Sequence, residues 1–221
     1  MIWDAAMPVA PDSLVHRYLA SRSIDLGAFG ATLTLRLHPG LPFYVQRDAS
    51  QTDGRRFEEI HVGPAMVAAI QAPDRTLAGV HCTWLAPDGD GKAVLEDGGA
   101  RLRVRKIFGA PKGGHVRFGP AGPRMAVGEG IESTLTVAAA VGVSAWAALS
   151  LANLRAPLPR VVREVVLALD NDERDHVLAE RNKRVAIAAH ATAGVIVRPL
   201  VPPPGNDWND VAMDAARKSA A

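Results

Sequence analysis

Cysteine is almost absent from this chain of 221 residues, and its scarcity limits the chemistry that the protein can use. The single cysteine, Cys82, cannot form an internal disulfide or a cysteine-based zinc site. Any metal ion is therefore expected to be held by oxygen ligands. Long hydrophobic runs are missing too, because no apolar stretch approaches the roughly 18 residues that a membrane span needs. With no basic-then-apolar segment at its start, the sequence predicts a cytoplasmic protein without a membrane partner.

Acidic residues are missing from one stretch in the middle of the chain. Between Gly98 and Gly128 there is no Asp or Glu, although the net charge of the whole chain is only +2. The same stretch carries seven basic residues, which are Arg101, Arg103, Arg105, Lys106, Lys112, Arg117 and Arg124. A charge run is often only a solvated surface, but such a surface normally alternates acids with bases. The unbalanced run favours a polyanionic partner.

The rest of the composition is ordinary for a globular protein, with 48% hydrophobic and 22% charged residues. In the first half, short apolar strands such as 65–70 and 77–85 follow a helix predicted over 14–22, which indicates a small α+β unit. Residues 1–11 have no periodicity and are predicted to be irregular. The prolines and glycine of 38–42 predict a turn.

After Gly128 the pattern changes to strand, helix, strand, and two apolar strands stop abruptly at carboxylates. The first is followed by Glu129, and the second, about forty residues later, is followed by Asp170 and Asp172. The carboxyl ends of parallel strands meet at one edge of a sheet, where α/β proteins bind ligands. Three carboxylates there would repel one another unless a divalent cation lay among them, and oxygen ligands suit Mg²⁺ or Mn²⁺. The sequence therefore predicts a metal site.

Each acidic motif also has a purely structural interpretation. Glu129 lies between two glycines and could simply favour the N-terminus of the next helix, while Asp-x-Asp is common in turns. Glu132, one turn into that helix, either assists the site or only stabilises the helix start. Both motifs occur in the same order that a shared site requires, each at the end of an apolar strand with a helix between. That combination favours the metal site.

An apolar strand ending in Glu-Gly, then a helix, then an apolar strand ending in Asp-x-Asp resembles the Toprim domain of primases, topoisomerases and some nucleases. The resemblance implies an α/β fold, with a Toprim-type (Rossmann-like) parallel sheet flanked by helices over about 125–221. It also implies that Glu129 is a metal ligand or acid–base group, and that Asp170 and Asp172 are metal ligands. Asp207 and Asp210 resemble the later acidic segment of primase Toprim domains, which implies that they are further metal ligands, and capping of the last helix explains them equally well.

The segment before this domain resembles the corresponding part of primase-like proteins of phages, plasmids and other mobile elements. The similarity lies in Gly79-Val-His-Cys-Thr-Trp-Leu, Gly91-Lys-Ala, Arg105-Lys-Ile-Phe-Gly109 and Gly113-Gly-His-Val-Arg-Phe. It implies a basic α+β subdomain over residues 1–124 that holds single-stranded DNA template and nucleoside triphosphates. The residues expected to make these contacts are Arg105 and Lys106 first, followed by Lys92, Lys112 and Arg117.

The function implied by the resemblance is that of a DNA primase-like nucleotidyltransferase, which synthesises short primers on single-stranded DNA. Two alternatives stay open: a Toprim-type metal-dependent nuclease, and a non-catalytic module that binds nucleic acid or a nucleotide and regulates another machine. Replicative primases usually have a zinc module that selects the template, which one cysteine cannot build, and the sequence has no P-loop. A helicase or replication protein acting in trans is therefore expected to supply unwinding or template recognition.

Overall fold

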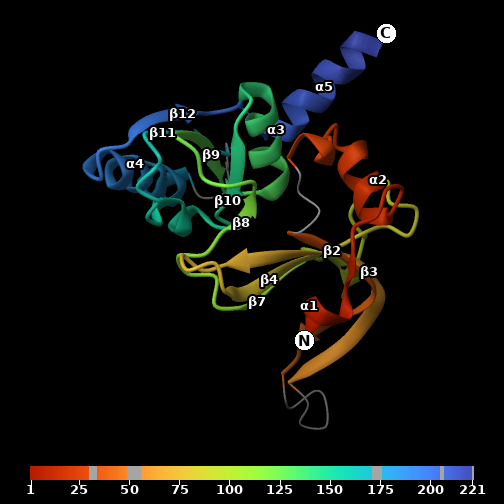
Figure 1. The fold of residues 1–221 in the computed structure, drawn as a ribbon. Coiled ribbons are helices and arrows are strands. Elements are labelled where there is room, and N and C mark those ends of the chain that lie inside the picture. The colour runs from red at the N-terminus through yellow and green to blue at the C-terminus, as the bar shows by residue number, and fades with distance from the viewer. Residues whose placement is uncertain (30–33, 49–55, 171–175, 205–206, 221) are drawn as a thin grey trace.

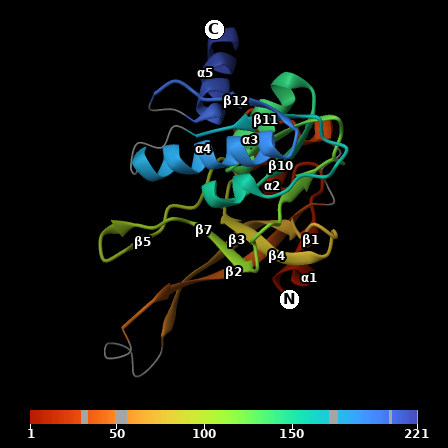
Figure 2. The same ribbon diagram turned by 90° about the vertical axis from the view of Figure 1, so that its left-hand side faces the viewer.

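The computed structural model describes residues 1–221 except 30–33, 49–55, 171–175, 205–206 and 221. The described residues form two five-stranded sheets, with helices packed between and against them (Figure 1). The same view turned by 90° shows the strands of the first sheet below those of the second (Figure 2). No helix in the described part of the chain is long and apolar enough to cross a membrane.

The first sheet is antiparallel throughout, with the strand order β1-β2-β3-β4-β7. Its strands are β1 (Met7–Pro8), β2 (Leu35–Gln46), β3 (Phe57–Gln71), β4 (Leu77–Trp84) and β7 (Arg105–Gly109). The strands predicted at 65–70 and 77–85 are confirmed as parts of β3 and β4. The prediction of an irregular N-terminus was wrong, because β1 hydrogen-bonds to β2. Backbone pairing of so short an edge strand needs no apolar periodicity.

The turn predicted at 38–42 does not form. Strand β2 runs through this segment with only a register shift between His38 and Leu41. Proline lacks the N–H that a central strand would donate, so it is tolerated on edge strands. Because β1 pairs only with Arg36 and Leu37, the rest of β2 has one free edge, and that edge accommodates Pro39 and Pro42.

The second sheet has the order β12-β11-β9-β10-β8. Its strands are β8 (Val116–Phe118), β9 (Arg124–Gly128), β10 (Ser144–Ala147), β11 (Glu164–Ala168) and β12 (Ile196–Leu200). The last four are parallel, and β8 is an antiparallel edge strand that pairs with β10. The central strand is β9. The edge strand β8 comes from before residue 124, so the first half of the chain contributes to this sheet.

Helices cover both faces of the second sheet. The remaining elements are α1 (Ile2–Ala5), α2 (Leu14–Ser21), η1 (Leu26–Phe29), β5 (Glu96–Asp97), β6 (Ala100–Arg101), α3 (Ile131–Val141), η4 (Leu151–Arg155), α4 (His176–Thr192) and α5 (Trp208–Ala220). Alternate residues of a strand point to opposite faces. Accordingly Ala126 of β9 lies in the cluster that contains α3, while Met125 and Val127 lie in the cluster with Ala186 of α4. The expected architecture, an α/β domain preceded in the chain by an α+β region, is confirmed.

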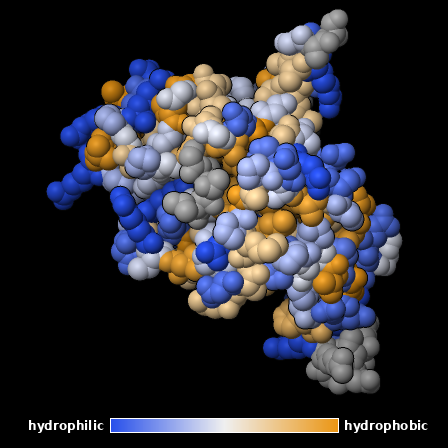
Figure 3. Space-filling view, turned by 45° about the vertical axis from the view of Figure 1, so that its right-hand side comes forward, coloured by the Kyte–Doolittle hydropathy of each residue, from blue (hydrophilic) through white to orange (hydrophobic). Residues whose placement is uncertain are grey.

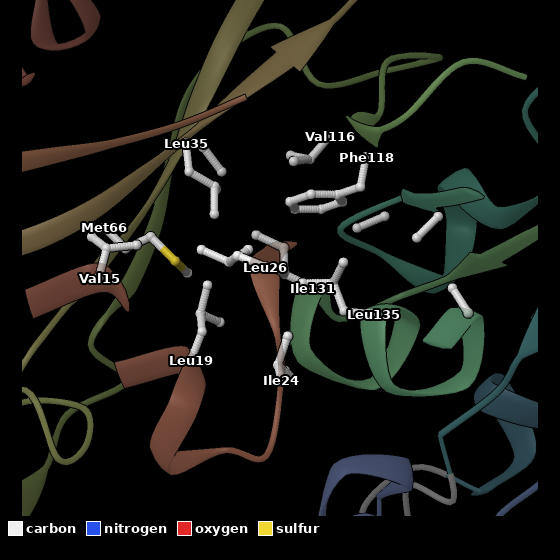
Figure 4. Close-up of a cluster of buried hydrophobic side chains, with 14 of the residues drawn as sticks. Val15, Leu19, Ile24, Leu26, Leu35, Met66, Val116, Phe118, Ile131 and Leu135 are labelled. Carbon is white, nitrogen blue, oxygen red and sulfur yellow. The ribbon is translucent and has the colours of Figure 1, made fainter. Parts of the chain in front are cut away.

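One hydrophobic core joins the two sheets. Leu19 of α2, Leu35 of β2 and Met66 of β3 share a buried cluster with Ile131 and Leu135 of α3 (Figure 4). Burying one such side chain contributes about 1.5–3 kcal/mol. The helix that follows Glu129 is therefore held from both halves of the molecule. By contrast, α5 packs on α3 and then projects away from the body, as the space-filling view also shows (Figure 3).

Candidate active site

Glu129 stands at the carboxyl end of the central strand β9. A side chain on the preceding residue, Gly128, would place its Cβ 2.9 Å from the carbonyl oxygen of Ala168 on β11, so only glycine fits between the strands. Gly130 then caps α3 in an extended conformation. The carbonyl of Glu129 accepts a hydrogen bond from the N–H of Leu149, 2.9 Å away, just after β10. The next two strands in the second sheet along the chain, β10 and β11, lie on opposite sides of β9. Glu129 therefore lies at the switch point of the sheet, where the strand order reverses.

Asp170 follows the neighbouring parallel strand. Residues Ala168 and Gly128 are register partners in β11 and β9, so Asp170 and Glu129 emerge at the same edge. Burial raises the pKa of the Asp170 carboxyl, with the Ser133 hydroxyl opposing the shift and the charge of Asp207 adding to it. Its Oδ1 is buried and has no hydrogen-bond partner among the described residues.

A buried carboxylate oxygen without a hydrogen-bond donor, at the carboxyl edge of a sheet, is suited to bind a cation. Leaving a buried acceptor unsatisfied costs about 1–3 kcal/mol, and a hard divalent ion would remove that penalty. Asp172, the predicted third ligand, lies outside the described residues. Within the part of the chain that is described, no group of three or more His, Cys, Asp or Glu side chains is arranged to hold a metal ion. The metal site therefore stays a prediction, and the carboxylate oxygens of Glu129 and Asp170 are of the ligand type that Mg²⁺ or Mn²⁺ prefers.

Asp207 and Asp210 form a capping pair at the start of α5. The Asp207 carboxylate accepts a hydrogen bond from the Asp210 N–H at 2.8 Å, and the Asp210 carboxylate accepts one from the Asp207 N–H at 3.4 Å. This is the reciprocal arrangement of a capping box. Asp207 is also close enough to raise the pKa of Asp170, whereas Asp210 pairs with Arg22 at 3.8 Å. Of the two, Asp207 is the one placed toward Asp170.

Glu132 is buried in a polar cluster that joins three elements. The Tyr18 hydroxyl of α2 donates a hydrogen bond to its carboxylate, and the Lys92 ammonium lies 2.9 Å from the same oxygen. Burial by itself would raise the pKa of Glu132, but the charge of Lys92 and the bond from Tyr18 outweigh burial and lower it to about 2. Glu132 also raises the pKa of Asp170. This cluster fixes the first turn of α3 beside the acidic edge.

Arg105 and Lys106 are neighbours on β7 and point to opposite faces of the first sheet, as strand alternation requires. Burial raises the pKa of both Asp170 and Tyr18, and the charge of Arg105 opposes part of that rise, so Arg105 acts electrostatically on this region. Lys106 lies over the ring of Phe43 at 4.1 Å and donates to the carbonyl of Tyr44. Of this pair, Arg105 is the residue whose charge acts on Asp170.

The other predicted basic residues occupy three separate environments. Lys92 is paired with Glu132, as described above. Arg117 stacks on Trp146 at 4.3 Å and donates to the carbonyl of Ala72 at 2.7 Å, and burial lowers its pKa. Lys112 is exposed and lines a hollow next to β10. The shared binding role of the five residues stays a prediction.

Three residues near the acidic edge were not singled out from the sequence. Tyr18 belongs to the helix predicted over 14–22, Ser133 belongs to no motif, and His81 lies in the Gly79-Val-His-Cys-Thr-Trp-Leu segment but was assigned no role. His81 is buried, its Nδ1 lacks a partner among the described residues, and burial lowers its pKa to about 4. A tyrosine on the apolar face of a helix is one available signal, because a buried hydroxyl needs a partner.

Comparison with protein families gives two consecutive matches. Residues 1–118 match the family described as "Domain of unknown function (DUF7146)", and residues 124–218 match the family described as "Toprim domain". The second match runs from β9 into α5. It therefore contains the acidic residues described above.

Solved structures of similar fold include bacterial DNA primases. A DNA primase domain from Pseudomonas aeruginosa is 16% identical, with a TM-score of 0.53 over 94% of this chain and 71% of that chain. The DnaG catalytic core is 14% identical, with a TM-score of 0.52 over 93% and 72%. The Aquifex aeolicus primase, with zinc-binding and RNA polymerase domains, is 15% identical, with a TM-score of 0.50 over 95% and 55%. At these identities the likeness is one of fold, and this chain spans about half of the Aquifex protein.

Proposed function

The chain is a Toprim primase-like protein whose first 118 residues belong to the family described as Domain of unknown function (DUF7146), and on that premise we propose that it synthesises short primers on single-stranded DNA as a metal-dependent nucleotidyltransferase. We place the boundary between a nucleic-acid-binding subdomain and a catalytic Toprim domain near residue 124. The observation that carries the proposal is the buried Oδ1 of Asp170, which has no hydrogen-bond partner among the described residues and lies at the strand edge that also carries Glu129.

In this proposal Asp170 and Asp172 hold Mg²⁺ or Mn²⁺, and Glu129 is a third ligand or the base that takes the proton of the attacking hydroxyl. Asp207 adds negative charge beside Asp170, while Asp210 supports it through the cap of α5. A bound divalent cation supplies charge stabilisation to the attacking and leaving oxygens. The 3′-hydroxyl of one nucleotide attacks the α-phosphate of the next, the bond to the β-phosphate breaks, and pyrophosphate leaves.

We assign binding of the triphosphate to Arg105, because its charge acts on Asp170. The unbalanced basic stretch around it would hold the template strand through phosphates rather than bases. A helicase or replication protein is the partner expected in trans for unwinding.

Primer synthesis is tested with labelled nucleotides, single-stranded DNA and Mn²⁺, comparing Asp170→Asn with the matched control Asp214→Asn. Asp214 is exposed on α5 and paired with Arg217, so its variant should retain activity. Asp170→Asn should lose at least about 100-fold in rate, the usual effect of removing a key electrostatic group. Undiminished synthesis by Asp170→Asn would reject the site.

The two alternatives give different results in the same experiment. A nuclease would shorten the DNA when nucleotides are withheld, and this shortening would require Asp170. A non-catalytic module would bind DNA but make no product, and its binding would survive the replacement of Glu129, Asp170 and Asp172 together.

A further inference from the structure

Two hollows lie side by side along η4 and the segment that leads to β11. The first has a volume of about 560 Å³, and its walls include Lys112, Leu149 and Arg155. The second has a volume of about 580 Å³, and its walls include Arg160, Arg163 and again Arg155. Arg155 and Pro157 line both hollows, so the two hollows adjoin, and together they are called the depression. Hereafter Lys112, Arg155, Arg160 and Arg163 are called the cationic track.

The track is positively charged and electrostatically uncompensated. All four side chains belong to exposed residues, and none has a carboxylate partner among the described residues. No Asp or Glu of the described chain lines either hollow. Elsewhere the arginines are often paired, as in Arg47 with Asp97 or Arg124 with Glu164. The carbonyl end of α4 faces the second hollow, but its partial negative charge is small beside three full positive charges.

One end of the depression is tied to the candidate active site and is built rigidly. Leu149, in its wall, donates its N–H to the carbonyl of Glu129 and adopts φ +66°, a conformation that is unfavourable for leucine. Asn153 accepts a bond from the Gly113 N–H at 2.8 Å and donates to the carbonyls of Gly114 and Ala148 at 2.7 and 2.9 Å. These bonds clamp the two sides of the first hollow together. The hollow is thus preformed, and it adjoins the backbone of Glu129.

We propose that the cationic track binds the sugar–phosphate backbone of single-stranded nucleic acid that passes the candidate active site. Cations spread over two joined hollows match a polymer with regularly spaced phosphates better than they match one small anion. The walls between them are apolar, with Pro157, Leu158 and Pro159, which gives bases a surface to lie against. The inference rests on the proposed function in taking nucleic acid as the ligand. It adds Arg155, Arg160 and Arg163, which follow residue 124, to the basic residues of the first half, of which Lys112 is part of the track.

The test measures binding by fluorescence anisotropy in buffer with a chelator, so that no catalytic step enters. The probe is a labelled oligothymidine of about 20 nucleotides, longer than the 4–16 that one small binding fold occupies. For single strands the slope of log K against log salt falls by about 0.7 for each phosphate contact removed. The variant Arg160→Glu/Arg163→Glu should therefore lower the slope by about 1.4 and weaken binding on the order of tenfold at low salt.

The matched control is Arg217→Glu/Lys218→Glu on α5, which changes the net charge equally and leaves the track intact. It should bind almost as the unmodified protein does, and Arg160→Lys/Arg163→Lys should keep its affinity because phosphate binding needs charge only. Arg155→Ala, at the junction of the hollows, should lower the slope by about 0.7, and it replaces the double variant if circular dichroism shows that the latter misfolds.

Equal slopes for the track variants and the α5 control would overturn the proposal. Binding of an acidic protein in place of nucleic acid would also overturn it, and polyglutamate is the probe for that case. The track variants would then lose binding to polyglutamate while their binding to oligothymidine is unchanged. The same series with an oligouridine distinguishes a path for the DNA template from a path for an RNA product. A track that carries the RNA product should bind the oligouridine more tightly than the oligothymidine. If the track variants lose DNA binding and the unmodified protein makes no primers, this proposal stands and the proposed function is refuted.

Discussion

Replacing Lys92 with methionine should destabilise the protein, even though Lys92 is a partly exposed residue on a loop. The side chain of Glu132 is only 8% exposed, and its carboxylate is held by Lys92 at 2.9 Å and by the Tyr18 hydroxyl. Removing one partner of a buried ion pair leaves an uncompensated buried charge, which typically costs about 3–5 kcal/mol. Since Lys92 is 30% exposed and Tyr18 keeps its bond, we expect the lower end, about 3 kcal/mol.

A loss of this size is easy to measure. For a chain of this length, 1 kcal/mol shifts the thermal midpoint by about 2–4 °C, so Lys92→Met should lower it by about 6–12 °C. The assay is thermal and urea unfolding followed by tryptophan fluorescence. Lys218→Met, on the exposed end of α5, is the matched control and should change the midpoint little. The double variant Lys92→Met/Glu132→Gln should be more stable than Lys92→Met, because it removes the stranded charge.

The pH dependence has a defined sign. The folded-state pKa of Glu132, about 2, is below its ordinary value of 4.5. The ion pair therefore contributes stability fully above pH 4.5, and this contribution is lost as the pH falls from 4.5 toward 2. The stability gap between the unmodified protein and Lys92→Met should narrow across that window. A gap that is absent at pH 7, or no larger than that of Lys218→Met, would refute the assignment of Glu132 as a buried, paired carboxylate.

Three further predictions concern the acidic edge and the hollow beside it. Arg105→Ala should raise the KM for nucleotide by about tenfold, whereas Lys106→Ala should change it little, because the two side chains lie on opposite faces of β7. Steady-state kinetics compares the two variants, and equal effects on KM would contradict the assignment of nucleotide binding to Arg105. Gly128→Ala should destabilise the fold by about 1–3 kcal/mol in urea unfolding, since its Cβ would press against the Ala168 carbonyl, and unchanged stability would show that the strands can separate there. Asn153→Ala should cost about 2–3 kcal/mol and speed hydrogen exchange at the Gly113 amide, whose unchanged protection would argue against the clamp.

The acidic edge could be predicted because its signal is local. A buried parallel strand must be apolar along its whole length, so the abrupt change to Glu129 or Asp170 marks a strand end, and parallel strands end at one edge. The pairing of β9 with β11, and its register, could be seen only in the structure. What each carboxylate contacts is not local: the structure shows Asp207 in the cap of α5, and its role in an acidic site stays a prediction.

The partners of Glu132 could not be read from the sequence. Tyr18 is 114 residues away along the chain, and Lys92 approaches from a loop of the other half. Which polar side chain reaches a buried carboxylate is decided by how the two sheets pack, and periodicity carries no information on that packing. The opposite facing of Arg105 and Lys106, by contrast, follows from strand alternation once β7 is assigned. The continuation of β2 through Pro39 and Pro42 could not be predicted from the sequence, because it depends on where the neighbouring strand β1 ends.

The most direct test of the central claim is the anomalous scattering of manganese in crystals of the protein soaked in Mn²⁺. A site that uses the buried Oδ1 of Asp170 predicts a manganese peak about 2.1 Å from that oxygen, with a second carboxylate from Asp172 or Glu129 in contact with the same ion. Manganese bound only elsewhere, or an Asp170 carboxylate that stays without a cation at saturating Mn²⁺, would contradict the account.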